Sequence, residues 1–282
     1  MLLAALLFST GGAAIKACSL PGWQVASLRS AIAAATLLLI LPEARGRWSG
    51  RAVAVGAAYA ATMVLYVLAN KLTTAASTIF LQSTAPLWVV LLGPWLLAER
   101  LRGRDLGFMV VLALGMALFF AGAGPPTATA PDPARGDVLA ALSGVTWALT
   151  ILGLRWLATG PDGGGVFGPA LICGNLLAFA AGVVAAPPFA WPSAVDGFVL
   201  GYLGACQVGL AYLFLGRGVR RVPAVEAALL LLVEPVLNAL WAWMLHGEAP
   251  GPLPIAGGAI VLAATAARTV GEARRLRARV AA

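Results

Sequence analysis

Long apolar runs alternate with short polar segments along the whole chain. Ten of these runs come close to the roughly 20 residues that an α-helix needs to cross a hydrocarbon layer of about 30 Å. They cover residues 1–18, 23–41, 52–69, 74–97, 106–122, 137–158, 166–186, 195–216, 223–246 and 252–268. The pattern predicts an all-α integral membrane protein with ten transmembrane helices.

One segment between the fifth and sixth runs differs in composition, because it is rich in Pro, Ala and Thr. Such a segment is typical of a linker. We therefore predict a first five-helix repeat over residues 1–122, a linker over 123–136, a second five-helix repeat over 137–270, and a basic tail over 271–282.

The fourth and ninth apolar runs resemble each other, since each has a proline near its middle and a glutamate at its end. Pro86 is followed by Glu99 and Pro235 by Glu248, in both cases 13 positions later. The two copies are therefore separated by an offset of 149 positions. A duplicated membrane unit with interrupted helices is typical of a secondary transporter with its substrate site near the bilayer midplane.

A second pair of matches supports the duplication. Phe8 and Lys16 in the first run correspond to Trp147 and Arg155 in the sixth, each at an offset of 139 positions. Because each repeat has an odd number of helices, the second repeat enters the membrane from the opposite side. The sequence thus predicts two inverted repeats, which is the arrangement expected for alternating access.

Composition and charge support this interpretation. The chain is 61% hydrophobic and 11% charged, with a mean hydropathy of +0.91, whereas soluble domains are about 25% charged. This composition excludes a soluble globular protein. The net charge of +8 does not indicate nucleic-acid binding, because 15 of the 19 basic residues fall in loops and the tail on one predicted side. The positive-inside rule then places both termini in the cytoplasm.

Catalytic and metal chemistry has little support in the sequence. His246 is the only histidine, the three cysteines are far apart, and no phosphate-binding glycine loop is present. We expect no metal, no cofactor and no cleavable leader before the first run. A serine protease within the membrane would need serine and histidine packed together. Ser83 and Ser143 are candidates for that role only by default.

Glu234 is the carboxylate expected near the membrane midplane. It lies about 16 Å into the ninth run at about 1.5 Å per residue. A charge facing lipid at that depth costs at least about 2.5–3.5 kcal/mol, so the side chain should face the bundle interior or a cavity. Glu234 could exchange a proton or contact a substrate ammonium. Alternatively, it could bind backbone groups that Pro235 leaves free.

Further candidates lie near the two prolines. Pro86 and Pro235 should interrupt their helices, and the resulting kinks could act as hinges or be static. Polar and aromatic side chains at comparable depth could line a central cavity or pack between helices. These candidates are Gln82, Ser83, Tyr59, Tyr66, Trp147, Gln207, Asn238 and Trp241, together with Trp88 and Tyr212.

Charged residues near the ends of the runs should have simpler roles. We expect Lys16, Arg29 and Arg155 to extend their charged ends to the membrane surface. Glu99 and Glu248 should be structural and pair with nearby arginines, Arg100 or Arg102, or with turn backbone.

Four motifs resemble one family. They are FSTGGAAIK at 8–16, SLRSAIAAATLLL at 27–39, APLWVVLLGPWLLAERL at 85–101 and LVEPVLNALWAWMLHGE at 232–248. Together they resemble the ten-helix EamA-type members of the drug/metabolite transporter superfamily, over nearly the whole chain. The resemblance implies inverted repeats around a central cavity. The chain looks most similar to YddG-type exporters of aromatic amino acids, on the basis of Trp147 and the Gln82–Ser83 pair.

From these observations we expect a multi-pass protein of the bacterial inner membrane that exports amino acids, including aromatic ones, by alternating access. Its expected partners are small-molecule substrates and the lipid bilayer, without nucleic acid, and a monomer would suffice. Other interpretations keep the fold but change the substrate to drugs or other metabolites. A membrane-embedded enzyme and a non-transporting receptor or scaffold are alternatives from other classes.

Overall fold

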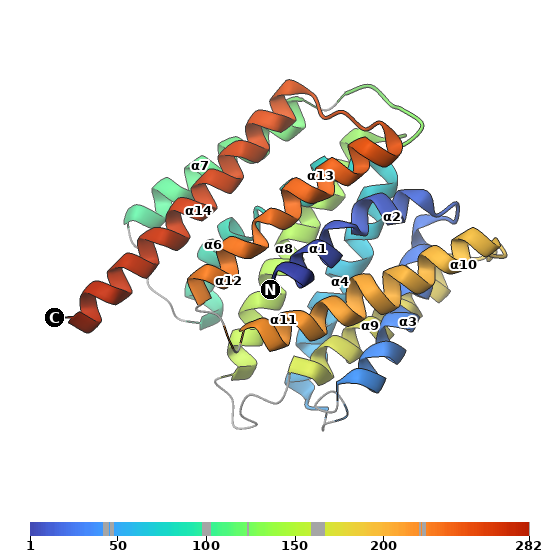
Figure 1. The fold of residues 1–282 in the computed structure, drawn as a ribbon, viewed down its shortest axis with the longest axis horizontal. Coiled ribbons are helices and arrows are strands. Elements are labelled where there is room, and N and C mark those ends of the chain that lie inside the picture. The colour runs from blue at the N-terminus through green and yellow to red at the C-terminus, as the bar shows by residue number, and fades with distance from the viewer. Residues whose placement is uncertain are drawn as a thin grey trace.

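The chain folds into a bundle of helices, and no strand occurs in the part of the chain that the structure describes (Figure 1). This computed structural model describes residues 1–41, 45, 48–97, 103–122, 124–158, 167–219, 221 and 224–281. Glu99, Arg100 and Arg102 therefore lie outside the described residues.

Some helices are long and continuous, and others are interrupted. The continuous ones are α3 (Gly22–Ile40), α4 (Gly50–Leu72), α7 (Gly103–Ala121), α8 (Pro133–Ala158), α9 (Phe167–Ala185) and α14 (Pro252–Ala281). The interrupted ones are α1 (Leu2–Ser9) with α2 (Gly11–Ala17), α5 (Ala75–Gln82) with α6 (Ala85–Leu97), α10 (Ala194–Gly201) with the π-helix η2 (Tyr202–Leu210) and α11 (Ala211–Val219), and α12 (Ala224–Leu231) with α13 (Val233–His246).

The number of apolar segments agrees with the ten runs predicted. Among the described residues, nine segments are long and apolar enough to cross a membrane, and the segment Leu2–Ala17 is shorter. Large apolar side chains also cover the outside of the bundle, for example Trp95, which is 88% exposed, and Trp191, which is 96% exposed. Such a surface suits lipid as the surrounding solvent.

Both proline-bearing segments are interrupted, as the sequence predicts. Pro86 lies in the first turn of α6 and Pro235 in the first turn of α13, where a missing backbone N–H costs little. In the first break, the Ser83 hydroxyl donates to the Ile79 carbonyl at 2.7 Å, and Thr84 donates to Leu81 at 2.6 Å. The same two carbonyls also accept the backbone N–H groups of Ser83 and Thr84, at 2.9 and 3.2 Å, so the hydroxyls add second hydrogen bonds at the break.

The first apolar segment is also broken, at Thr10, which the sequence analysis did not predict. The following glycines allow α2 to approach its neighbours closely. A Cβ atom built on Gly12 would lie 2.5 Å from Asn238 Oδ1 and 2.8 Å from Ala75 Cβ. Gly12 therefore brings α2, α5 and α13 together, in agreement with the use of small residues at membrane helix contacts.

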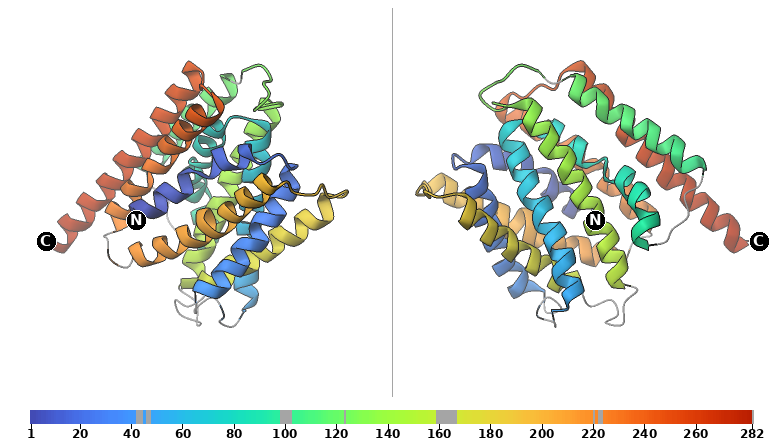
Figure 2. Two further views of the ribbon diagram at one scale, coloured as in Figure 1. Left: turned by 45° about the vertical axis from the view of Figure 1, so that its right-hand side comes forward. Right: turned by 180° about the vertical axis from the view of Figure 1, so that it is seen from behind.

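Helices from the first and second parts of the chain interlock rather than forming separate bodies. Helix α4 packs along both α8 and α9, α3 packs against α9 and η2, and α7 lies beside α14 (Figures 1 and 2). Helix α13 lies against α1, α2 and α5. Elements from the beginning and the end of the chain thus surround the same interior.

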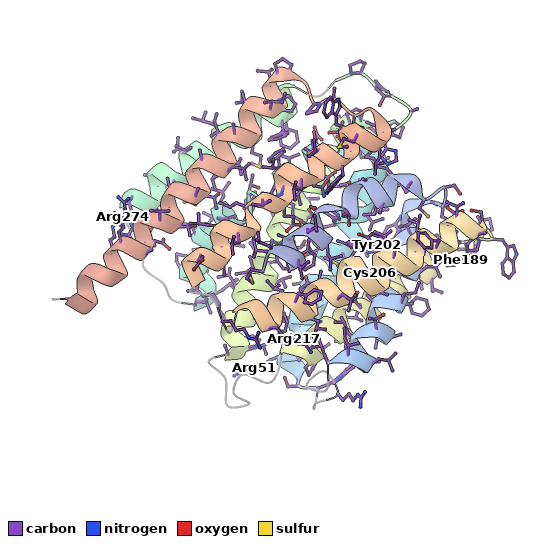
Figure 3. The ribbon with its side chains drawn as sticks, viewed as in Figure 1. Arg51, Phe189, Tyr202, Cys206, Arg217 and Arg274 are labelled. Atoms are coloured by element: carbon purple, nitrogen blue, oxygen red, sulfur yellow. The ribbon has the colours of Figure 1, made fainter. Side chains whose placement is uncertain are left out.

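One end of the bundle is rich in arginine. Arg51 opens α4, Arg217 lies near the end of α11, and Arg274 lies in the distal half of α14 (Figure 3). The opposite end of α4 is Leu72, about 30 Å away at 1.5 Å per residue. The turn that follows Leu72 therefore lies at the opposite end of the bundle.

Candidate functional site

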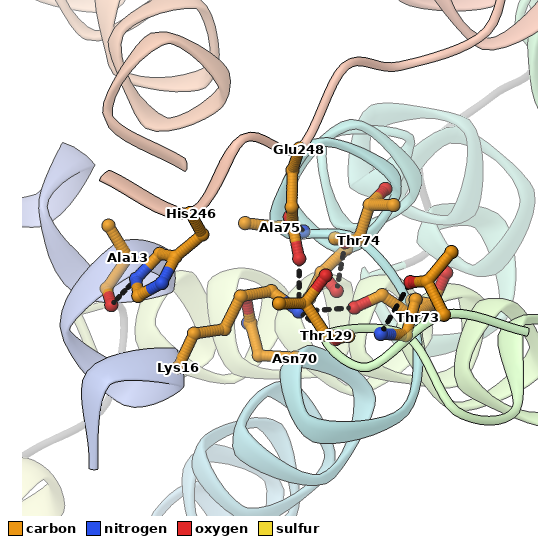
Figure 4. A network of polar contacts seen from close by, with 12 residues as sticks. Ala13, Lys16, Asn70, Thr73, Thr74, Ala75, Thr129, His246 and Glu248 are labelled. Carbon is orange, nitrogen blue, oxygen red and sulfur yellow. Dashed lines mark hydrogen bonds and ion pairs between the residues drawn. The ribbon is translucent and has the colours of Figure 1, made fainter. Parts of the chain in front are cut away.

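The opposite end of the bundle contains a buried ion pair between the two halves (Figure 4). Lys16 Nζ lies 2.7 Å from Glu248 Oε1, and each side chain is 3% exposed. Lys16 also donates to the carbonyls of Thr73 at 2.8 Å and Thr129 at 2.6 Å, while Glu248 Oε2 accepts from the backbone N–H of Ala75 at 2.9 Å. We call these five residues the end seal.

Neighbouring contacts extend the end seal. His246 Nε2 lies 2.8 Å from the Ala13 carbonyl (Figure 4). The Thr73 hydroxyl donates to Asp137 Oδ1 at 2.7 Å. The prediction that Lys16 extends to the membrane surface is therefore wrong, because a buried carboxylate and two carbonyls hold its ammonium. The structural role expected of Glu248, including binding to turn backbone, agrees with these contacts.

A cavity of about 370 Å³ lies inside the bundle. Its walls come from α1, α3, α4, α5 and α6 in the first half and from α8, η2, α11, α12, α13 and α14 in the second. The lining is mostly apolar, with a few polar and charged groups, which is typical of a site for a small organic ligand.

Most of the residues selected from the sequence line this cavity. They are Gln82, Ser83, Tyr66, Trp147, Gln207 and Glu234, with both prolines, Pro86 and Pro235, and with Tyr212. The interrupted helices explain this convergence, since each break places polar side chains and a proline beside the cavity. Gln207 lies on the π-helix, an element that is often found at functional sites.

Four of the selected residues, Tyr59, Trp88, Asn238 and Trp241, lie outside the lining, and Trp88 packs against the buried cluster that contains Leu112 and Val261. Tyr59 packs edge-on against Tyr212, with ring centroids 5.9 Å apart. Asn238 Nδ2 donates to the Tyr66 hydroxyl at 3.1 Å. Trp241 Nε1 donates to Ser9 Oγ at 3.0 Å. Tyr59 and Asn238 thus support residues of the cavity wall from behind.

Arg29 lines the cavity although the sequence analysis did not select it. The prediction that it extends to the membrane surface is wrong, since it is 1% exposed. It lies seven residues into α3, about 10 Å from the start of that helix. An ionisable residue at such a depth within an apolar run is itself a signal of function that the sequence carries. Phe8, Thr62 and Met63 are further lining residues that it did not select as contacts.

Glu234 faces the cavity from the first turn of α13. Within the described residues, neither a hydrogen bond nor an ion pair reaches its carboxylate. The interpretation in which Glu234 binds backbone groups freed by Pro235 therefore has no contact to support it. A carboxylate that faces an internal cavity can exchange a proton or bind a cation.

No group of three or more His, Cys, Asp or Glu side chains suitable for a metal occurs among the described residues. The polar groups that face the cavity are an arginine, a carboxylate, amides and hydroxyls. Such groups form hydrogen bonds and ion pairs with an organic ligand.

Comparison with known proteins identifies a family, a relative and a solved structure of the same fold. A model described as the EamA-like transporter family matches residues 1–121 and residues 134–268. "Uncharacterized protein PA1977" of Pseudomonas aeruginosa is 35% identical over 244 residues, which cover 81% of this chain and 77% of that protein. A solved crystal structure covers 97% of this chain and 96% of its own, with a TM-score of 0.63 and 23% identity, and so shares the fold.

Proposed function

This chain belongs to the EamA-like transporter family, and on that premise we propose that it exports amino acids, including aromatic ones, across the bacterial inner membrane. Membership confirms the family resemblance of the motifs and favours transport over membrane-embedded catalysis. One observation carries the proposed substrate. The cavity between the two halves combines aromatic walls with two oppositely charged side chains, Arg29 and Glu234.

The proposed architecture is two inverted five-helix repeats. The family model matches the chain twice, over residues 1–121 and 134–268, and each match contains one proline-interrupted segment. An odd number of crossings in each repeat gives the two copies opposite orientations. The arginine-rich end of the bundle then faces the cytoplasm together with both termini, and the end seal faces the outside.

The proposed mechanism is alternating access with Pro86 and Pro235 as hinges. The end seal joins Lys16 and Thr73 of the first half to Glu248 of the second, so it would have to break before the cavity could open on that side. The helix breaks at the prolines leave few backbone hydrogen bonds to resist bending at the cavity. Movement at these breaks would open the two ends in turn.

A drug or another metabolite is the alternative substrate within the same fold. The lining includes Ile79, Ile151, Val208 and Leu215, which suit an apolar molecule without charged groups. This alternative makes no use of Arg29 and Glu234, and for that reason we rank it second.

We expect purified protein in proteoliposomes to take up labelled phenylalanine, tryptophan and threonine with saturable kinetics. An imposed pH gradient tests whether proton movement drives the flux. Uptake should be reduced by an excess of the other amino acids, because they share one cavity. Protein-free liposomes of the same lipid composition provide the background rate.

No uptake of any amino acid in tight vesicles that contain folded protein would contradict this substrate and favour the alternative. Binding of an amino acid without flux would instead indicate a receptor.

Alternating access predicts that one cavity position is reachable from both sides of the membrane. In a variant with Cys18, Cys173 and Cys206 replaced by serine, Ser83→Cys places a thiol on the cavity wall. A membrane-impermeant maleimide should label this thiol from either side, and saturating substrate should change the balance between the sides. Trp95→Cys, at a position 88% exposed on the outside of the bundle, is the control. Labelling of Ser83→Cys from one side only under every condition would contradict the mechanism.

A further inference from the structure

We infer that Arg29 and Glu234 are the two ends of one zwitterion site, in which Arg29 binds the substrate carboxylate and Glu234 its ammonium. This inference rests on the proposed function and deepens it, since it names the chemical class that the cavity selects. The substrate would be an α-amino acid with both groups charged.

Arg29 has the features of an anion site. Its side chain is 1% exposed and faces the cavity. Its Nη2 atom lies 3.2 Å from the Met63 sulfur, a weak acceptor, and its Nε has no hydrogen-bond partner. Within the part of the chain that the structure describes, no carboxylate forms an ion pair with it. A guanidinium so placed can bind a carboxylate through two parallel N–H donors.

Glu234 is the matching cation site. It faces the same cavity from α13, in the second half of the chain, whereas Arg29 lies on α3 in the first half. The described residues provide no partner for its carboxylate. A carboxylate that faces an internal cavity without a counter-charge is costly, so the arrangement favours a ligand that supplies the missing ammonium.

Among the ion pairs of the described residues, Arg29 and Glu234 are not paired with each other. Tyr66 and Tyr212 line the same cavity as Arg29 and Glu234. Asn238 Nδ2 donates to the Tyr66 hydroxyl at 3.1 Å and thereby holds the Tyr66 ring in place. A zwitterion placed between the two charges would neutralise both without adding net charge to the membrane interior.

The remaining part of the cavity wall would contact the side chain of the substrate. Trp147 lines the cavity beside Ile151 on α8, with Phe8 contributed by α1. Aromatic rings gain from stacking or edge contacts with a substrate ring. The polarity of the site therefore comes from the two charges, and the preference among amino acids comes from this apolar wall.

The first test uses the unaltered protein and three ligands that share one ring. Phenylalanine has both charged groups, phenethylamine lacks the carboxylate, and 3-phenylpropionate lacks the ammonium. In competition with labelled phenylalanine, each incomplete analogue should bind about ten- to hundred-fold more weakly than phenylalanine, the range for a lost hydrogen bond to a charged group. Equal competition by either analogue would overturn the zwitterion site while leaving amino-acid transport intact. Absence of binding by any amino acid would overturn the proposed function and the site together.

The second test assigns each end. Arg29→Gln should remove the preference for phenylalanine over phenethylamine, while keeping the preference over 3-phenylpropionate, and Glu234→Gln should do the reverse. Because these are ratios, a smaller amount of folded protein does not change them. Arg29→Lys should partly restore the preference for a carboxylate, and it provides a second variant if Arg29→Gln does not fold. Preferences that remain unchanged in both Gln variants would overturn the assignment.

Matched controls remove the same charges elsewhere. Arg217→Gln removes an exposed cation on α11, and Glu226→Gln removes an exposed carboxylate on α12, the helix that precedes Glu234. Neither residue lines the cavity. Both variants should keep the ligand preferences of the unaltered protein. A loss of preference in either control would mean that net charge, rather than Arg29 and Glu234, sets the selectivity, and would overturn the inference.

Discussion

Lys16→Met is expected to destabilise the protein by about 3–5 kcal/mol, the cost of leaving one member of a buried ion pair without its partner. The Glu248 side chain is only 3% exposed, and in the variant its carboxylate would lose the ammonium that it pairs with. The carbonyls of Thr73 and Thr129 would lose their hydrogen-bond donor as well. The loss of stability can be measured by thermal unfolding in detergent, with the fraction of protein that remains monodisperse as the readout.

The double variant Lys16→Met with Glu248→Met should recover much of this stability, because removing both charges also removes the uncompensated one. Arg135→Met provides a control, since Arg135 is an exposed cation at the start of α8. It should change stability by less than about 1 kcal/mol. A Lys16→Met protein as stable as the unaltered one would show that the end seal contributes nothing to the folded state.

The same variant bears on transport. If the end seal closes one side of the cavity, its loss should favour the state that is open on that side. Labelling of Ser83→Cys should then shift toward the end-seal side in the Lys16→Met background. Unchanged labelling would separate the stabilising role of the ion pair from any role in closure.

Gly12→Val is expected to cost about 3 kcal/mol or more, the upper part of the range for overpacking. The new Cβ would lie 2.5 Å from Asn238 Oδ1, 2.8 Å from Ala75 Cβ and 3.1 Å from Asn70 Oδ1, so three neighbouring helices would have to move. Displacement of Asn238 would also release the Tyr66 hydroxyl at the cavity wall. We therefore expect little folded protein, and weaker phenylalanine binding by any protein that folds.

Gly107→Val is the matched control, because a Cβ atom at Gly107 meets no other atom within 4 Å. Gly107 also lies within a helix, α7, so the two substitutions differ mainly in the space available. Equal stability of Gly12→Val and Gly107→Val, measured by thermal unfolding in detergent, would contradict the close packing at Gly12.

The sequence was sufficient to predict the class of fold and much of the candidate site. A span of about 20 apolar residues follows from the thickness of the bilayer, so the transmembrane segments could be read without any tertiary contact. The interruptions at Pro86 and Pro235 follow from the missing backbone N–H, which is a local property. Glu234 could be placed inside the bundle because a charge facing lipid is costly.

Only the tertiary structure decided how side chains from distant segments pair. Lys16 and Arg29 are both cations near the start of the chain, yet one is held by Glu248 and the other faces the cavity. Their position along a helix does not distinguish these outcomes, because helix rotation and the neighbouring helix determine them. The break at Thr10 and the place of Tyr59 behind Tyr212 depend in the same way on packing between helices. The bilayer imposes its requirements for length and apolar composition on each helix separately, so these can be predicted from the sequence. Contacts between helices depend on how all of them pack together.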